Sequence, residues 1–387
     1  MRILQVSTST FADPRYYRSN ELALSSSLVK LGHDVTIFTA NKSPKWQMLD
    51  STSVQPALDT IEGITIRRFP AGPELPNHSI TPTMFNAILK QRCDVVHTHR
   101  ILPPSSFYAA LACKMKQRPL ILTEHDYMFG STHGLKLFAY ALYGTTIGRF
   151  VTQSASAIIG ISSTALKFVH NFGAGGGKSV LIPSSVDTTL FRPNQKSLLT
   201  TWAPEIGRPV VLYVGRLKKS KGVEYLLRAF SNVAAQIPGA HLVILGRGPD
   251  EFRLKNIRTL LRLRNVHFLG RLPRNQMPYV YPGCDLFVLP STFEPFGNVV
   301  LEAMASGLPV VGTDTGGMSD TIEHRQTGFH MQPGDVEQLS RFMTLLLTDR
   351  KLKLQMARAA RLAAEKKYDD MVIAKSIEKA YERCLNV

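Results

Sequence analysis

The chain has 387 residues, of which 44% are hydrophobic, and this is enough to fill two ordinary domain cores. Its four cysteines show neither the paired spacing of a metal site nor the density of a disulfide scaffold, which suits a reducing cytosol. No uncharged apolar run is long enough to span a bilayer, and the first residues predict a strand rather than a signal peptide. We therefore expect a soluble, cytoplasmic protein.

The net charge of +17 predicts an anionic partner, namely phosphates, acidic lipid headgroups or nucleic acid. Nucleic-acid binding would also need a groove-reading motif or aromatic residues among the basic ones, and the basic cluster at 253–264 contains no aromatic residue. A solvated helix face is the simpler interpretation of any single cluster. For the total charge we favour attraction to an anionic membrane surface, with the protein peripheral on the inner membrane face.

Strand and helix patterns alternate along the whole chain. In the first half, short apolar runs predict strands at 3–6, 33–38, 94–97, 120–123 and 157–160, and a helix at 21–31 is closed by a glycine. The pattern restarts with strands at 209–214, 241–245, 285–289 and 309–311. Buried runs separated by helices indicate parallel sheets with helices on both faces.

The fold class predicted is therefore α/β, with two doubly wound Rossmann-like domains facing each other across a cleft. We predict a first domain at 1–190, a linker rich in Pro, Asn and Thr at 191–208, and a second domain at 209–365. Ligands of such sheets bind beyond the carboxyl ends of the strands, so motifs with chemistry should stand at strand ends.

Two glutamates eight positions apart carry the strongest signal. A buried strand precedes them, Pro295 and Gly297 suit a turn, and an apolar helix side follows, so Glu294 falls in the turn and Glu302 in the helix. A helix N-terminus after a tight turn binds anions, because its first N–H groups are unpaired. Eight helical steps would span roughly 12 Å, which suits the two ends of an extended nucleotide-sugar.

Cations stand at another predicted strand end, where Gly215 is followed by Arg216 and, after a lysine-rich loop, by Lys221. Two fixed cations can neutralise a diphosphate leaving group without a metal. An ordinary surface loop is the alternative, and on these residues alone it stays open. No Asp-x-Asp pair, the usual metal-holding motif for a nucleotide diphosphate, occurs in the chain.

The next two strand ends offer weaker candidates. Gly246 lets a nucleotide approach the backbone closely, although a tight turn without a ligand is equally plausible. Arg271 and Leu272 follow the strand that begins at 266 and could border the base.

In the first half, His125 ends a strand and is followed by Asp126, a pair that can orient a sugar hydroxyl or move a proton. His97 and His99 alternate along the preceding strand and could suggest a metal pair. No third ligand is apparent from the sequence, so we interpret these two as packing or cleft-wall residues and predict no metal site.

These residues resemble the retaining glycosyltransferases of family four, which have the GT-B fold. The likeness covers nearly the whole chain and is strongest from 210 to 335, where the Gly215-Arg216…Lys221 and Glu294…Glu302 motifs lie. It implies that a C-terminal helix at 366–387 returns to the first domain, that the nucleotide-sugar binds the second domain and that the acceptor binds the first. The first loop, residues 9–18, departs from the family because it has no glycine.

The resemblance also assigns roles. It places Glu294 at the donor sugar, Glu302 at the ribose, Arg216 and Lys221 at the diphosphate and His125 facing the sugar. Adding the local patterns, we predict catalytic roles for His125, Glu294, Arg216 and Lys221, and substrate contacts for Gly215, Gly246, Arg271, Leu272, Pro295, Phe296, Gly297, Asn298, Val299 and Glu302.

The predicted function is transfer of a hexose, with retention and without a metal or other cofactor, from a nucleotide diphosphate sugar to a glycan or lipid-linked acceptor. Such an enzyme would serve glycan or polysaccharide biosynthesis. A nucleotide-sugar epimerase or hydrolase on the same fold is the alternative. A non-catalytic basic protein that binds anionic lipid or nucleic acid is a more remote one.

Overall fold

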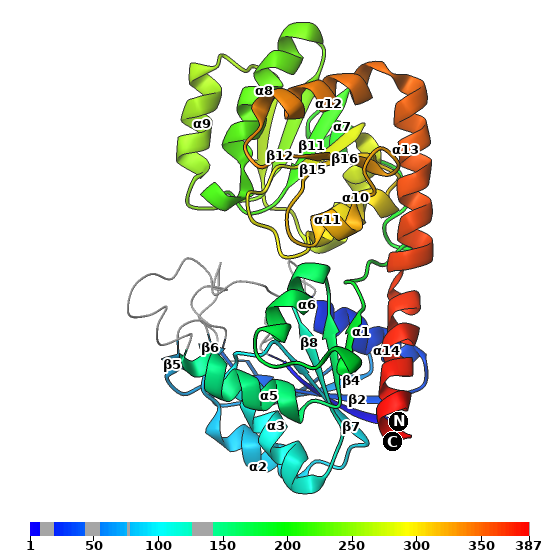
Figure 1. Ribbon diagram of the computed structural model, residues 1–387. Coiled ribbons are helices and arrows are strands. Elements are labelled where there is room, and N and C mark those ends of the chain that lie inside the picture. Colours follow the sequence, from blue (N-terminus) through cyan, green and yellow to red (C-terminus); the bar gives the residue numbers. More distant parts are fainter. Residues whose placement is uncertain (8–18, 43–54, 76–77, 126–141, 387) are drawn as a thin grey trace. The chain divides into compact units, whose positions relative to one another are not determined.

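The computed structural model describes residues 1–7, 19–42, 55–75, 78–125 and 142–386. The chain forms two compact units, of which unit 1 comprises Met1–Pro183 with Asp370–Val387 and unit 2 comprises Ser184–Asp369 (Figure 1). Among the described helices, none combines the length and the apolar character needed to cross a bilayer.

Unit 1 contains an eight-stranded sheet in the order β10-β9-β8-β7-β1-β2-β4-β3, which is parallel except for the edge strand β3. Its strands are β1 (Arg2–Val6), β2 (Asp34–Ala40), β3 (Leu58–Ile61), β4 (Ile64–Phe69), β7 (Val95–His99), β8 (Leu120–Glu124), β9 (Ala157–Gly160) and β10 (Ser179–Leu181), and β5 (Glu74–Leu75) pairs with β6 (His78–Ser79) separately. Its described helices are α1 (Asn20–Lys30), α2 (Pro82–Lys90), α3 (Pro104–Lys116), α5 (Arg149–Ser154), α6 (Ser163–His170) and α14 (Asp370–Leu385).

Helices cover both faces of this sheet because successive strand residues point to opposite sides. In β1, Ile3 belongs to the core on the side of α1 and α14, whereas the next residue, Leu4, belongs to the core with α2, α3 and α5. The last helix, α14, contributes Ile373, Ile377 and Tyr381 to the first of these cores, so it is an integral layer of unit 1.

Unit 2 contains a six-stranded parallel sheet in the order β13-β12-β11-β14-β15-β16. The strands are β11 (Val210–Val214), β12 (His241–Leu245), β13 (Val266–Gly270), β14 (Leu286–Leu289), β15 (Val310–Thr313) and β16 (Gly328–Met331). The helices are α7 (Leu199–Trp202), α8 (Val223–Gln236), α9 (Glu251–Leu260), α10 (Asn298–Ala305), α11 (Met318–Thr321), α12 (Val336–Thr348) and α13 (Arg350–Ala363).

The alternating pattern in the sequence thus predicted the two parallel sheets correctly, but the division of the chain differs. Unit 2 begins at Ser184, and the predicted linker, 191–208, belongs to it. Phe191 and Leu199 are buried, and the Phe191 ring packs edge-on against Tyr281 at a centroid distance of 5.7 Å. A segment rich in Pro, Asn and Thr therefore does not act as a spacer here, because its apolar residues anchor it. That the two sheets face each other across a cleft stays a prediction.

Candidate active site

The most informative place in unit 2 is the gap between the carboxyl ends of β11 and β14. The chain passes from β11 to β12 and β13 on one side and then returns to β14 on the other side, so the strand order reverses at this pair. In open parallel sheets, ligands bind at such a reversal, outside the carboxyl ends of the strands. The predicted cations follow β11 and the predicted glutamates follow β14.

Lys221 and Glu294 meet at this reversal. The Lys221 ammonium lies 2.5 Å from the Glu294 carboxylate, which also accepts a hydrogen bond of 3.1 Å from the Ser291 hydroxyl. The side chains of Lys221 and Glu294 are only 16% and 10% exposed. The sequence predicted Lys221 and Glu294 separately as site residues, and in the structure the two are in direct contact.

Backbone packing brings the two loops together. Gly222 has φ +67°, and a Cβ there would lie 1.9 Å from the carbonyl oxygen of Pro290, so only glycine fits. The Thr292 N–H also donates to the Ser220 carbonyl at 2.9 Å. The loop after β11 is thus packed on the segment that carries Glu294.

Further positive charge surrounds this pair. Arg216 is exposed, and its carbonyl accepts a hydrogen bond of 3.1 Å from the buried Tyr213 hydroxyl, which fixes the loop at Gly215. Burial and the nearby charges of Lys221 and Arg216 lower the pKa of Lys218. Lys218, which we did not predict as a site residue, is thus a third cation of the same loop. Such a cluster suits a diphosphate.

Glu302 has partners of its own on the second turn of α10. Its carboxylate accepts a hydrogen bond of 2.7 Å from the Tyr281 hydroxyl and lies 3.8 Å from the Arg274 guanidinium. Burial raises the pKa of Glu302, and Arg274 and Tyr281 oppose this shift. The carboxylate is therefore held in place by two side chains from outside its own helix.

The turn between the two glutamates is tightly built. Gly297 stands at the N-cap of α10 with φ +86°, and a glycine has no side chain that could accept a hydrogen bond from the first turn. Asn298 and Val299 are the first two residues of this helix. Phe296 is buried, and the Pro295 carbonyl accepts a hydrogen bond of 2.9 Å from the Gly317 N–H. Because α10 begins at Asn298, Glu294 lies in the turn and Glu302 in the helix, as the sequence predicted, and the eight steps between them are half turn and half helix.

The weaker candidates also lie at carboxyl ends of strands. A Cβ on Gly246, just after β12, would lie 1.9 Å from the carbonyl oxygen of Gly215. The close approach that needs a glycine here is therefore between two loops of the chain. Arg271 and Leu272 directly follow β13 and are partly exposed.

In unit 1 the strand order reverses between β1 and β7, and buried polar residues gather there. The Gln5 amide oxygen lies 2.7 Å from Nε2 of His99, and Nδ1 of His99 lies 3.0 Å from Nε2 of His125. An amide oxygen only accepts, so His99 carries its proton on Nε2 and accepts at Nδ1 from the Nε2–H of His125. This leaves Nδ1 of His125 as an acceptor.

Glu21, at the start of α1, joins these histidines. Ligand atoms of Glu21, His99 and His125 all lie within 4.8 Å of one another, so this donor set could hold a divalent cation. The sequence hinted at a pair formed by His97 and His99, but the structure groups His99 with residues from two other segments. Burial lowers the pKa of His99 to about 3 and that of His125 to about 4, so both rings are neutral at pH 7.

His97 has a structural role beside this cluster. Its Nδ1 lies 2.7 Å from the Tyr381 hydroxyl on α14, and its Nε2 lies 2.7 Å from the Thr123 hydroxyl. The Gln5 amide also donates to Tyr381 at 3.4 Å. The network thus links α14 to the histidines, and it agrees with the interpretation of His97 as a packing residue. Asp126 and the first loop, 9–18, lie outside the described residues.

Comparison with known families identifies the chain. A model described as "Glycosyltransferase Family 4" matches residues 22–190, and one described as "Glycosyl transferases group 1" matches residues 201–363. The chain belongs to the family 4 glycosyltransferases. The resemblance drawn from the two glutamates and the Arg216–Lys221 loop is therefore confirmed at the level of the family.

Individual relatives of this glycosyltransferase agree. It is 31% identical over 303 residues to the sulfoquinovosyl transferase of Arabidopsis thaliana, covering 75% of this chain but only 57% of that protein's length. Sucrose-phosphate synthase from Thermosynechococcus elongatus superposes with a TM-score of 0.78 at 21% identity, over 100% of this chain and 99% of that one. Anabaena HepE, in complex with UDP-glucose, gives 0.74 at 21% identity, over 99% and 100%. The GT-B fold is confirmed.

Sequence reasoning missed several side chains of this glycosyltransferase. Tyr281 and Arg274 reach Glu302 from a different segment, and Ser291 supports Glu294. Gln5 and Glu21 likewise reach the histidines from distant segments of unit 1, the first strand and the first helix. Apart from Ser291, which stands three positions before Glu294, these pairings have no local signal, although the position of Gln5 near the end of the first strand could have marked it as a candidate.

Proposed function

We propose that this glycosyltransferase transfers a hexose from a nucleotide diphosphate sugar to a glycan or lipid-linked acceptor, with retention of configuration and without a metal ion. The observation that carries the proposal is the contact between Lys221 and Glu294 at the reversal of strand order in unit 2. A carboxylate for the sugar and an ammonium for the diphosphate stand side by side there, as a nucleotide-sugar requires.

In this proposal the second unit binds the donor along the loops after β11 and β14. Arg216, Lys218 and Lys221 face the diphosphate, and Glu302, held by Tyr281, accepts hydrogen bonds from the ribose hydroxyls. Glu294 binds hydroxyls of the hexose. The first N–H groups of α10 add positive potential near the leaving group.

The proposed chemistry is attack on the same face of the sugar. The bond between the anomeric carbon and the phosphate oxygen breaks, and the acceptor oxygen forms the new glycosidic bond. The acceptor's proton passes to the departing phosphate oxygen. Lys221 and Arg216 act because negative charge on the diphosphate grows in the transition state, so their attraction is stronger there than in the ground state.

In this proposal His125 acts as a neutral ring with its proton on Nε2. The hydrogen-bond chain from Gln5 through His99 leaves Nδ1 of His125 with a lone pair, which can accept a hydrogen bond from a hydroxyl of the bound sugar. A neutral histidine also adds no positive charge that would compete for the diphosphate. We assign Gln5 and His99 as positioning residues.

The test is an assay of the purified protein with UDP-, GDP- and ADP-hexoses and a mixture of glycan acceptors, read by proton NMR. The proposal expects a product whose anomeric configuration equals that of the donor, with a rate unchanged by a metal chelator. Inversion of the anomeric centre would overturn the mechanism. Fast loss of the donor without any acceptor would point instead to a nucleotide-sugar hydrolase or epimerase.

A further inference from the structure

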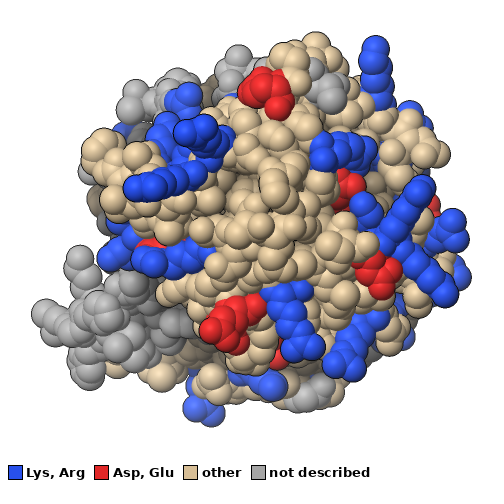
Figure 2. Space-filling view, turned by 90° about the horizontal axis from the view of Figure 1, so that it is seen from above, with Lys and Arg blue, Asp and Glu red and all other residues tan. Residues whose placement is uncertain are grey.

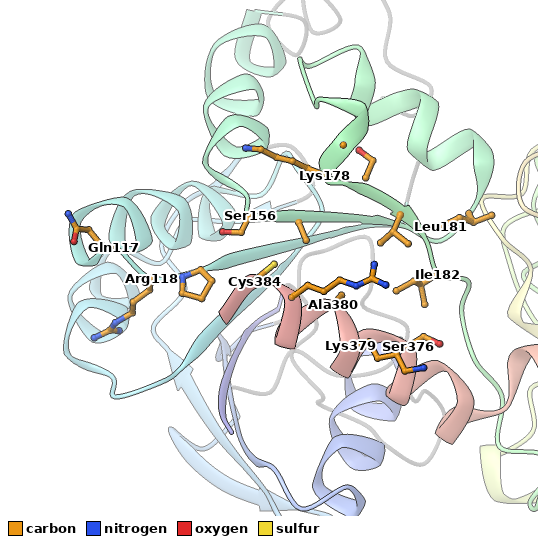
Figure 3. A pocket seen from close by; sticks show the side chains of 16 residues that line it. Gln117, Arg118, Ser156, Lys178, Leu181, Ile182, Ser376, Lys379, Ala380 and Cys384 are labelled. Atoms are coloured by element: carbon orange, nitrogen blue, oxygen red, sulfur yellow. The ribbon is translucent and has the colours of Figure 1, made fainter. Parts of the chain in front are cut away.

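A cavity lies at the opposite end of the sheet in unit 1, away from the histidines. It has a volume of about 910 Å³ and lies beside α14, at the amino-terminal ends of β8 and β9 and along the whole of β10. Figure 3 shows this hollow between Ser376 and Ala380 of α14 on one side and, on the other, Leu181 at the end of β10 and Ile182 just after it. Its floor is apolar, with Pro119, Ala157 and Val180 among its residues.

The charged residues that line this hollow are all cationic. They are Arg118, Lys178, Lys379 and Arg383, and no carboxylate is among the lining residues. Within the part of the chain that the structure describes, none of the four forms an ion pair. Arg118 donates to uncharged groups, the Gln91 carbonyl at 2.7 Å and the Cys93 sulfur at 3.6 Å, and Lys178 donates to the Ala155 carbonyl at 3.2 Å. The hollow therefore keeps an uncompensated positive charge.

Topology explains why cations gather at this end. The carboxyl ends of helices and the amino ends of strands share one edge of a parallel α/β unit, and helix C-termini favour Lys and Arg. Lys114 and Lys116 occupy the last turn of α3 in this way. Positive charge is not confined to this edge, since Figure 2 shows Lys and Arg side chains in several groups on another face. The hollow differs because it combines charge with apolar lining residues in one concave site.

Exposed apolar side chains lie in the hollow or close in sequence to residues that line it. Leu181, which lines the hollow, is 46% exposed, and Met115, between Lys114 and Lys116, is 61% exposed. Leu385, next to the lining residue Cys384, is 40% exposed. Large apolar side chains set among Lys and Arg are typical of surfaces that meet the headgroup region of a bilayer, where both kinds of side chain find partners.

We propose that this hollow binds the phosphodiester headgroup of an anionic phospholipid and so attaches unit 1 to a membrane surface. The cationic rim holds the phosphate, and the apolar floor with Leu181 meets the first carbons of the lipid. The site is separate from the proposed donor and histidine sites. β8 begins beside the hollow at Leu120 and ends at Glu124, before His125, so about 13 Å of strand separates them.

The test measures binding of the full chain to vesicles made of equal parts phosphatidylglycerol and phosphatidylcholine. The double variant Lys379→Gln/Arg383→Gln changes only exposed positions of α14, and we expect it to bind roughly 30-fold more weakly, since each basic residue near an anionic surface contributes about 1 kcal/mol. The matched control, Lys351→Gln/Arg358→Gln, removes the same charge from exposed positions of α13 in unit 2. It should bind within roughly threefold of the parent.

Leu181→Ser keeps every charge, and it should weaken vesicle binding several-fold if the apolar floor takes part. Equal losses in the two double variants would overturn the proposal, because general electrostatic attraction would then explain the binding. Binding of soluble glycerol 3-phosphate without binding to vesicles would overturn the assignment to a lipid. Vesicles of phosphatidylcholine alone should not bind the protein.

Discussion

The pair of Lys221 and Glu294 yields a quantitative prediction, because each residue stabilises the other in the absence of substrate. Coulomb's law gives an attraction of about 7 kcal/mol for unit charges 2.5 Å apart at an effective dielectric constant of about 20. Desolvation of both groups offsets much of this attraction, and breaking a buried pair from one side costs roughly 3–5 kcal/mol. Since both side chains keep some exposure, we expect the lower end.

We therefore expect Lys221→Met to lower the free energy of unfolding by about 3 kcal/mol, because among the described residues it leaves the buried carboxylate with the Ser291 hydroxyl alone as partner. Lys221→Met/Glu294→Gln should lose less than the sum of the two single variants, with a coupling of about 2 kcal/mol. Urea denaturation of the four proteins gives these values. For Lys221→Met, kcat should also fall by roughly 100-fold or more, since the leaving diphosphate loses a cation.

A matched control lies on α9, where Lys255 and Glu251 form an ion pair of 2.8 Å whose side chains are 49% and 28% exposed. The same cycle of substitutions there should give a coupling of about 0.3–0.5 kcal/mol. If the Lys221 and Glu294 losses add to within about 0.5 kcal/mol, the two charges are not coupled and the reasoning from burial is refuted.

Three further predictions concern the groups around the site. Tyr281→Phe removes the hydrogen bond to Glu302, so the affinity for nucleoside diphosphate should fall about tenfold in calorimetric titration, and an unchanged affinity would contradict the role of Tyr281. Gln5→Leu removes the acceptor that fixes the proton of His99 on Nε2, so kcat should fall at least about tenfold while KM for the donor stays near the parent value. An equal change in kcat and KM would indicate a merely structural effect. His99 and His125 stay unprotonated in the folded state at pH 5, whereas the unfolded chain binds protons there as pH falls from 6.5 to 5. The free energy of unfolding should therefore drop by up to about 1.4 kcal/mol per pH unit for each of the two residues. His125→Asn should reduce this slope.

The sequence predicted features whose residues are close together in the chain, and it did not predict contacts between residues that are far apart in the chain. Glu294, Glu302 and the turn between them are close in sequence, so strand, turn and helix signals placed them without knowledge of the fold. The contact of Lys221 with Glu294 depends on β11 and β14 being neighbours, and no local pattern determines strand order.

The histidine cluster shows the same limit more sharply. His99 is the last residue of β7 and His125 follows the adjacent β8, yet Gln5 and Glu21 reach them from the first strand and the first helix. A buried polar residue near the end of an apolar strand is ambiguous in sequence, because it becomes informative only when its partners are known. The linker was predicted wrongly for a related reason, since composition alone concealed the buried Phe191.

The central claim is that Glu294 serves the reacting sugar while Glu302 serves the nucleotide. It is tested most directly by measuring donor affinity and single-turnover transfer in Glu294→Gln and Glu302→Ala. The account predicts opposite patterns. Glu294→Gln should keep donor affinity within a few-fold and lose turnover by roughly 100-fold, whereas Glu302→Ala should lose roughly tenfold in affinity with a smaller effect on turnover at saturation. Donor affinity and turnover that stay unchanged in both variants would contradict the account.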